Sequence, residues 1–309
     1  MRLGLSKLVN TEVCSTEELC FHISKYNELI RESNKNLRIQ PHRGAKTLPL
    51  QGDSLVIGSM DVAALYPNCK TKGTMAAIEE ATKLSGMNFE RVNKQFLVKF
   101  VSITTRGKSG NNRIDEFLQK PKSRTTLSSF LKRKSESQFL GPPLRAVEEL
   151  NPQDVRILLG MASARSTRHV MSNHFFSING QIYKQRDGSP IGMDLSVEGA
   201  SIYMTLWDKK FMNKLRKLGI CLGLYKRYVD DIVVGLRAIS PGWFFDLKSN
   251  KMQFDAKHVN STWKSDARTL SVLKDIANSI DPDIQMETDV PSAHSSGRLP
   301  VLDLNLFVA

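Results

Sequence analysis

Apolar and polar residues alternate along the chain with periods that predict most of its elements. Apolar residues recur at helical spacing in 15–33, 73–104, 152–170 and 195–218, so each of these stretches is predicted to be largely helical. The compact apolar run 55–62 includes an acid near its end and predicts a buried strand.

Turn signals add two predicted hairpins. Asn179-Gly180 separates two short apolar runs within 175–183, which is typical of a tight hairpin, and 224–236 forms a second hairpin bent at two adjacent aspartates. A capping box at 15–18 marks the start of the first helix. Antiparallel hairpins among long helices predict an α+β fold, in which a small antiparallel sheet is backed by helices.

Composition narrows the class of protein. The chain has 309 residues, of which 40% are hydrophobic, and this is ample for a buried core. Lys and Arg exceed Asp and Glu by 44 to 31, and the net charge of +13 favours a polyanionic partner such as nucleic acid. No run approaches a membrane span or a signal-peptide core. We therefore expect a soluble, intracellular protein with no membrane partner, and the choice between nucleus and cytoplasm stays open, as does the oligomeric state.

The four cysteines form no CxxC pair, so neither a zinc knuckle nor a disulfide framework is expected, and we interpret them as reduced thiols. Residues 106–140 combine nine Lys and Arg with three acids among many Ser and Thr, which predicts a mobile basic insertion. The insertion either holds a template backbone or is a solvated linker. It divides the chain into the segments 1–105, 106–140 and 141–309.

Three aspartates form the candidate catalytic set. Asp61 stands near the end of the apolar strand, and Asp230 and Asp231 stand together at the predicted bend. Asp61 taken alone would fit an ordinary strand-ending turn. Two adjacent carboxylates repel one another, however, and a purely structural hairpin would favour Asn-Gly or Asp-Gly, so a bound cation explains the pair better. Mg²⁺ prefers such oxygen ligands, and the Val62 carbonyl is a further candidate.

A glycine-bearing bend that opens a helix is the second candidate feature. It runs from Gln185 through Gly188 to Gly192 and suits the close approach of a nucleotide or a template strand to backbone amides. Taken singly, Gly-Ser-Pro also fits an ordinary loop.

These features resemble the motifs of a known family. Asp61-x4-Tyr66, the Gln185/Gly188 turn and Tyr228-Val229-Asp230-Asp231 occur in the order of reverse transcriptase motifs A, B and C. The segments 59–67 and 297–303 further resemble Penelope-like retroelements, and the resemblance runs from about residue 3 to residue 308. It implies a polymerase palm and an RNA-directed DNA polymerase that uses an RNA template, a DNA primer, dNTPs and two Mg²⁺ or Mn²⁺ ions.

The resemblance also assigns roles. Asp61 and Asp230 resemble the two metal-binding acids, and Asp231 an additional or occasional ligand. Tyr66 resembles the sugar gate that excludes a ribose hydroxyl, with a packing aromatic as the alternative. Gln185 and Gly188 resemble residues beside the nascent base pair, and Tyr228 resembles a support for the primer end.

The sequence departs from the family at motif B, where Ser189-Pro190 come early and Met193-Asp194 stand where Ser-Pro is expected. This departure puts the roles of Gln185 and Gly188 in doubt. The triphosphate-gripping finger motifs would lie before residue 3 and the thumb after residue 309, so we expect partial fingers and a truncated thumb. The GIY-YIG nuclease of the family has no counterpart in the chain.

Three alternatives to a reverse transcriptase also fit parts of the sequence. The segment 61–67 also resembles motif A of family B DNA polymerases, but those enzymes have Gly-Asp-Thr-Asp where this chain has Tyr228-Val229-Asp230-Asp231. The second rival is an incomplete, inactive element fragment that binds nucleic acid through its +13 charge. A structural or scaffold role comes third, since it would need neither the acids nor the charge.

Overall fold

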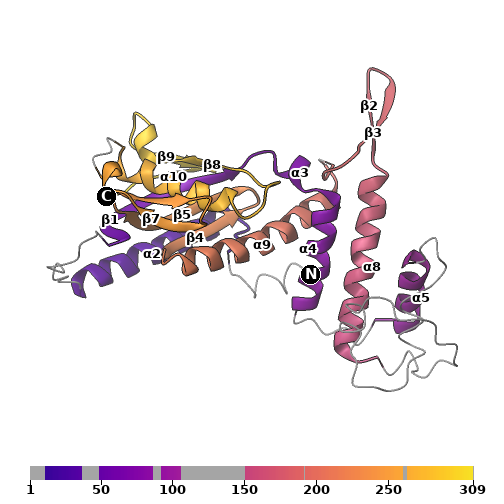
Figure 1. Ribbon diagram of the computed structural model, residues 1–309. Helices are drawn as coiled ribbons and strands as arrows, with labels where there is room; N and C mark the ends of the chain where they lie inside the picture. The colour runs from indigo at the N-terminus through magenta and orange to yellow at the C-terminus, as the bar shows by residue number, and fades with distance from the viewer. Residues whose placement is uncertain are drawn as a thin grey trace. The chain divides into compact units, whose positions relative to one another are not determined.

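The computed structural model describes residues 11–36, 49–85, 92–105, 150–190, 192–259 and 263–308 (Figure 1). The chain forms two compact units, one made of Met1–Leu8 and Cys69–Tyr203 and the other of Val9–Asn68 and Met204–Ala309. For brevity we call them the helical unit and the sheet unit. The predicted α+β class is confirmed. The predicted insertion 106–140 falls within 106–149, outside the described residues, so the three predicted segments stay a prediction.

A four-stranded antiparallel sheet is the centre of the sheet unit. Its strands are β1 (Gln51–Val62), β4 (Leu222–Tyr228), β5 (Asp231–Ile239) and β8 (Met286–Asp289), in the spatial order β4-β5-β1-β8. Strand β1 therefore lies between two strands that come much later in the chain. Residues 11–13 add to the outer edge of β4, where the Arg227 N–H donates to the Thr11 carbonyl at 2.8 Å.

Both faces of this sheet are covered. Gly58 of β1 faces helix α10 (Ser265–Asn278), so closely that a Cβ there would lie 2.7 Å from Leu270. The neighbouring Ile57 points the opposite way, as successive strand residues do, and belongs to a core cluster with Leu19 of helix α2 (Thr16–Asn36) and Leu299. Leu299 belongs to the small hairpin β9 (Leu299–Val301) and β10 (Leu304–Leu306).

The start of α2 follows the predicted capping box with one change. The Glu18 N–H donates to Ser15 Oγ at 3.2 Å, while the Glu18 carboxylate accepts from the N–H of Cys14, one residue before the expected partner. The remaining described elements of the sheet unit are α3 (Leu65–Asn68), β6 (Trp243–Asp246), β7 (Lys251–Phe254), η2 (Ala256–His258) and η3 (Pro291–Ala293).

Helix α9 (Asp194–Lys217) runs through the boundary between the units at Tyr203 and Met204. In the sheet unit its Trp207 and Phe211 are buried with ring centroids 5.0 Å apart, and Phe211 lies 5.9 Å from the ring of Tyr225 on β4. This aromatic packing attaches the second half of α9 to the sheet.

The helical unit consists, in its described part, of α4 (Thr71–Leu84), α5 (Lys94–Thr105), α8 (Pro152–Ser172) and the hairpin β2 (Phe175–Ile178) and β3 (Gln181–Lys184), with the first half of α9. The stretch 73–104 therefore forms two helices, and 86–91 between them lies outside the described residues. Gly160 lets α8 approach α4, because a Cβ there would lie 3.3 Å from the Glu79 backbone. The side chain of Asn151 accepts from the Asp154 N–H and caps α8.

All four cysteines are free, as predicted, and one of them, Cys69, is buried. Within the part of the chain that the structure describes, no helix combines the length and the apolar character needed to cross a membrane.

Candidate active site at the end of the central strands

Asp61 is the second-to-last residue of the central strand β1. Its neighbours Met60 and Val62 are buried, with 0% and 2% of their surfaces exposed, while Asp61 itself is exposed. Strand alternation explains this pattern, because successive side chains point to opposite faces of a sheet. Asp61 pairs with Glu287 of β8, so a further carboxylate lies directly across the strand from it.

Asp230 and Asp231 lie at the tip of the β4–β5 hairpin. Tyr228 pairs with Asp231 as the last pair of the ladder, which leaves Val229 and Asp230 as a two-residue turn. The prediction placed both acids at the bend, whereas the structure places Asp230 in the turn and Asp231 at the first position of β5. Val229 has a φ of 56°, a left-handed conformation that is strained for a β-branched residue.

The strand register brings the two acidic segments together. Met60 of β1 pairs with Ile232 of β5, so the next position along each antiparallel strand sets Asp61 opposite Asp231. Three strands that are distant in the sequence thus contribute carboxylates to one end of the sheet. The hydrophobic pairs deeper in the ladder fix this register, since a slip by one residue would turn every side chain to the opposite face.

The carboxylates perturb one another. Burial raises the pKa of Asp61, and the charges of Asp230 and Glu287 raise it further, although a hydrogen bond from the Val62 backbone opposes them. Burial and the charges of Asp230 and Asp61 likewise raise the pKa of Asp231. The folded chain therefore gathers negative charge that a bound cation would stabilise.

A buried ion pair supports the strained turn from behind. Arg227 of β4 and Asp208 of α9 are both fully buried, and Arg227 Nε donates to Asp208 Oδ2 at 2.9 Å. Tyr225 Oη and Thr11 Oγ1 also donate to Asp208, at 2.6 and 2.9 Å. Such a pair is stable in the interior only with these additional hydrogen bonds.

The same arginine reaches the turn itself. Arg227 Nη1 donates to the carbonyl of Val229 at 2.9 Å, so the network fixes the residue that directly precedes Asp230. Burial alone would lower the pKa of Arg227, but Asp208 and Tyr225 outweigh burial and raise it, so the guanidinium stays charged. Sequence reasoning missed this role, because nothing local pairs Arg227 with an aspartate 19 residues earlier in the chain.

The two predicted tyrosines belong to the same unit as the acids. Tyr66 lies in the short helix α3 and is partly buried. That helix begins directly after a tight turn in which Ala64 has a φ of 51° and Asn68 Nδ2 donates to the Ala63 carbonyl at 2.9 Å. Tyr228 is 36% exposed and pairs with Asp231. The turn thus fixes the path of the chain from Asp61 to Tyr66.

The predicted residues Gln185 and Gly188 belong to the helical unit and form a closed turn. Gln185 Nε2 donates to the carbonyls of Asp187 and Gly188, both at 3.1 Å, and Gly188 has a φ of 84° that favours glycine. Burial would raise the pKa of Asp187, but hydrogen bonds from the N–H groups of Thr71 and Gly188 outweigh burial and lower it. The amide of Gln185 thus holds the loop in shape, and the predicted role of Gln185 and Gly188 beside a base pair stays a prediction.

The predicted metal ligands meet the needs of Mg²⁺ only in part. Among the described residues, no three His, Cys, Asp or Glu side chains gather into a group that could hold a metal ion by itself. Mg²⁺ commonly takes one or two carboxylates and fills its remaining positions with water and substrate phosphates. Asp61 with Asp230 or Asp231 fits that sparse set, and burial together with neighbouring negative charge raises the pKa values of Asp61 and Asp231.

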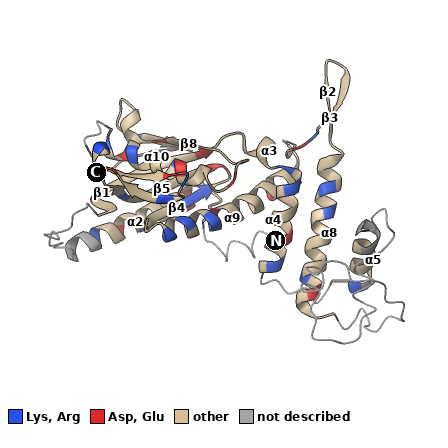
Figure 2. Cartoon of the chain, in the orientation of Figure 1, with Lys and Arg blue, Asp and Glu red and all other residues tan. Residues whose placement is uncertain are grey.

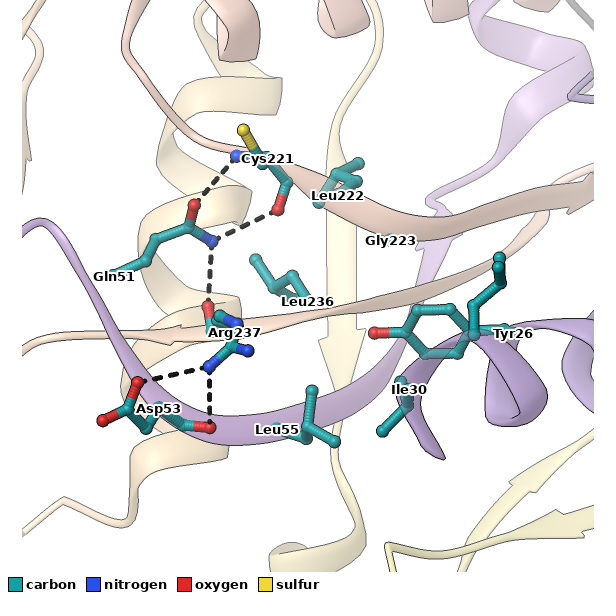
Figure 3. Close-up of a pocket in the computed structure, with 11 residues that line it drawn as sticks. Tyr26, Ile30, Gln51, Asp53, Leu55, Cys221, Leu222, Gly223, Leu236 and Arg237 are labelled. Atoms are coloured by element: carbon teal, nitrogen blue, oxygen red, sulfur yellow. Dashed lines mark hydrogen bonds and ion pairs between the residues drawn. The ribbon is translucent and has the colours of Figure 1, made fainter. Parts of the chain in front are cut away.

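A separate cavity lies at the other end of β1 (Figure 3). It has a volume of about 320 Å³ and is lined by residues that include Tyr26, Leu55 and Leu236. Gln51 closes one side, where its Nε2 donates to the carbonyls of Cys221 and Arg237 at 3.2 and 3.0 Å. The cavity and Asp61 are at opposite ends of the strand, so the cavity is not part of the acidic site.

Two solved structures resemble the chain at low sequence identity. No protein-family model and no curated protein matches the chain. Telomerase from Candida albicans, solved in complex with a TWJ fragment of telomeric RNA, is 16% identical with a TM-score of 0.39 over 76% of this chain and 29% of that one. Apo telomerase from Candida tropicalis, truncated from its C-terminal domain, is 12% identical with a TM-score of 0.44 over 99% of this chain and 42% of that one. The chain spans less than half the length of either structure.

Proposed function

We propose that the chain is the palm region of an RNA-directed DNA polymerase that extends a primer by two-metal nucleotidyl transfer. The observation that carries the proposal is the strand register, which sets Asp61 of β1 beside Asp231 of β5 and next to the Val229-Asp230 turn. A purely structural sheet end gains nothing from three neighbouring carboxylates that repel one another, whereas a divalent cation would turn that repulsion into attraction.

The proposed reaction follows from this placement. The primer 3′-hydroxyl loses its proton to water and its oxygen bonds to the α-phosphorus of a deoxynucleoside triphosphate, while the bond from that phosphorus to the bridging oxygen breaks to release pyrophosphate. Two divalent ions, Mg²⁺ or Mn²⁺, would stabilise the attacking and leaving oxygens when bound. Asp61 and Asp230 would hold them, with Asp231 and the Val62 carbonyl as further ligands.

The remaining roles come from the resemblance to reverse transcriptases. Tyr228 would support the primer end, and Gln185 and Gly188 would stand beside the nascent base pair. The motif segments 59–67 and 297–303 support the finer assignment to a Penelope-like retroelement. The second of these segments includes β9 and a turn in which Leu302 has a φ of 50°.

Tyr66 would act as the sugar gate, five residues after Asp61. The variant Tyr66→Ala would remove the ring that presses on C2′, so we expect it to incorporate ribonucleotides more readily than the wild type does. The ratio of rUTP to dUTP incorporation on a poly(rA) template measures the effect. An unchanged ratio would show that Tyr66 is a packing aromatic.

The proposed activity is tested by primer extension on poly(rA)/oligo(dT) with dTTP and either Mg²⁺ or Mn²⁺. The wild type should extend the primer, and Asp230→Ala should abolish extension. A matched control is Asp53→Ala, because Asp53 lies on the same strand as Asp61 and its side chain is 82% exposed in a surface pair with Arg237.

A second candidate function is nucleic-acid binding without polymerisation, which the net charge of +13 favours. It predicts that neither the wild type nor Asp230→Ala extends the primer, while both bind the duplex in a salt-sensitive way. Extension by the wild type and by Asp53→Ala, together with loss in Asp230→Ala, excludes it.

A further inference from the structure

The β2–β3 hairpin exposes an unusual amount of apolar surface. All eight of its strand residues are exposed, and five of them are large and apolar. The most exposed, Ile182, has 78% of its surface accessible, and Phe175 has 55%. Scattered single apolar residues are normal on a protein surface, but a contiguous group of this kind marks an interaction site.

Its two faces carry different chemistry. Cross-strand pairing sets Phe176 against Tyr183 on one face, where the two rings stack with centroids 5.7 Å apart and planes 19° apart. Phe175 pairs with Lys184 on the other face, and the Lys184 ammonium lies 5.8 Å from the Phe175 ring centroid. Each face therefore offers an exposed aromatic ring, and one face adds a cation.

The charge around the hairpin has a single sign. No Asp or Glu occurs between His174 and Arg186, and Figure 2 shows the two strands free of acidic residues. Arg168 and His169, near the end of α8, are also exposed. The nearest acid that follows, Asp187, already accepts from the N–H groups of Thr71 and Gly188. An anionic partner is therefore favoured over a neutral or cationic one.

We propose that the β2–β3 hairpin binds single-stranded nucleic acid. Bases stack on the exposed rings of Phe175, Phe176 and Tyr183, while Lys184 and Arg186 contact the phosphates. Exposed aromatic rings interleaved with cations are the usual means of binding single strands without sequence preference. The inference does not depend on Asp61, Asp230 or Asp231, so it holds whether or not the chain polymerises.

The test uses fluorescence anisotropy with labelled (dT)20 and (rU)20 over a range of salt concentrations. The variant Phe176→Leu/Tyr183→Leu keeps the hairpin apolar but removes the stacking surface, so we expect its affinity to fall about tenfold or more. A matched control is Phe21→Leu/Phe96→Leu, which makes the same kind of change at rings that are 64% and 67% exposed on α2 and α5.

Salt dependence separates stacking from charge. Lys184→Gln should reduce the slope of log affinity against log salt by about 0.7, the contribution of one phosphate contact on a single strand. Phe176→Leu/Tyr183→Leu should weaken binding and leave the slope unchanged. Circular dichroism and thermal unfolding should match the wild type for every variant, because the substituted side chains are exposed.

Equal affinity of Phe176→Leu/Tyr183→Leu and the wild type would overturn the proposal, as would an equal loss in the control. The competing occupant is a second copy of the chain. Loss of self-association in Phe176→Ser/Tyr183→Ser during sedimentation, with nucleic-acid affinity unchanged, would assign the hairpin to that contact and also overturn the proposal. The wild type should bind the oligonucleotides whether or not it extends a primer, so failure of the polymerase proposal would appear separately, as absent extension.

Discussion

At the scale of single residues, the crowded carboxylates are the feature with the clearest consequence for stability. The pKa values of Asp61 and Asp231 both lie above the ordinary value of 3.8 because of burial and neighbouring charges. A raised carboxyl pKa favours the protonated form in the folded state. Protonation of these two carboxyl groups therefore stabilises the fold fully below pH 3.8, and this contribution is lost as the pH rises through the folded-state pKa values. Repulsion between the carboxylates is strongest at neutral pH.

Asp61→Asn should therefore raise the thermal stability of the metal-free chain at pH 7. The gain should be no more than about 1 kcal/mol, since the site is partly solvated, and that corresponds to about 2–4 °C. The difference from the wild type should disappear near pH 3, and Mg²⁺ should raise the melting temperature of the wild type more than that of the variant. Thermal unfolding across this pH range measures both effects. If Asp61→Asn is less stable than the wild type at pH 7 without metal, repulsion among the carboxylates does not destabilise the fold and this explanation is wrong.

Arg227 yields a second prediction at this scale. Arg227→Lys keeps the charge beside Asp208 but cannot both pair with Asp208 and donate to the Val229 carbonyl, so the turn that precedes Asp230 loses its support. We expect kcat for primer extension to fall about tenfold or more with little change in KM, because positioning by about 1 Å is worth up to about 100-fold.

The matched control for this variant is Thr205→Ala. Thr205 accepts from Arg227 Nη2 at 3.3 Å in the same buried network but makes no contact with the turn through that bond. The Thr205→Ala variant should lose some stability and keep most of its kcat for primer extension. Equal losses of kcat in the two variants would mean that Arg227 acts through general stability rather than through the turn.

At the scale of elements, a substitution in the strained turn between β4 and β5 should change stability and primer extension in opposite directions. Val229→Gly should relieve a strain of about 1–3 kcal/mol at the cost of about 0.5–1 kcal/mol in chain entropy. The net effect is a stabilisation of between about 0 and 2.5 kcal/mol, measurable by urea unfolding. Extension should nevertheless slow, because glycine fixes the position of Asp230 less firmly.

Asn250→Gly is the control for this turn, since Asn250 also has a φ of 56° but lies between β6 and β7. It should change extension little. If Val229→Gly destabilises the chain, the left-handed φ at Val229 carries no strain and this part of the account is wrong.

Local patterns explain which elements could be predicted. The four predicted helical stretches and the two predicted hairpins follow from periods of apolar residues and from turn signals such as Asn179-Gly180, which act over a few neighbours. Helix α10 and the hairpin of β6 and β7 were not predicted. Strand β8 was missed because Met286–Asp289 reads Met-Glu-Thr-Asp, with one apolar residue and no clear alternation. The Glu287 carboxylate across from Asp61 was missed with it.

The acids of the candidate site could be predicted from the sequence, but the way in which the fold brings them together could not. Asp61, Asp230 and Asp231 stand out because acids that end or interrupt apolar strands are costly. The sheet order β4-β5-β1-β8, which sets them together, is non-local and has no signal in any window of sequence. For the same reason the buried Arg227 and Asp208 pair, and the discontinuous sheet unit, could not be predicted.

At the scale of the whole molecule, charge and catalysis should be separable. The net charge of +13 predicts that binding to an RNA/DNA duplex weakens steeply with salt. Asp61→Asn should bind that duplex without metal at least as tightly as the wild type, since it removes one negative charge. Filter binding between 50 and 200 mM salt, a range over which several phosphate contacts cost about 10³-fold or more, measures this. A large loss of affinity in Asp61→Asn would mean that the acid supports the fold and not the reaction.

The central proposal is that Asp61, Asp230 and Asp231, which the register of β1 and β5 brings to one end of the sheet, hold a divalent cation together with substrate phosphates. Its most direct test is the binding of Mn²⁺, followed by electron paramagnetic resonance in the presence of primer, template and a non-hydrolysable nucleotide. We predict that the wild type and Asp53→Ala bind Mn²⁺ equally, and that Asp61→Asn binds it at least about tenfold more weakly. Equal Mn²⁺ affinity in all three proteins would contradict the claim.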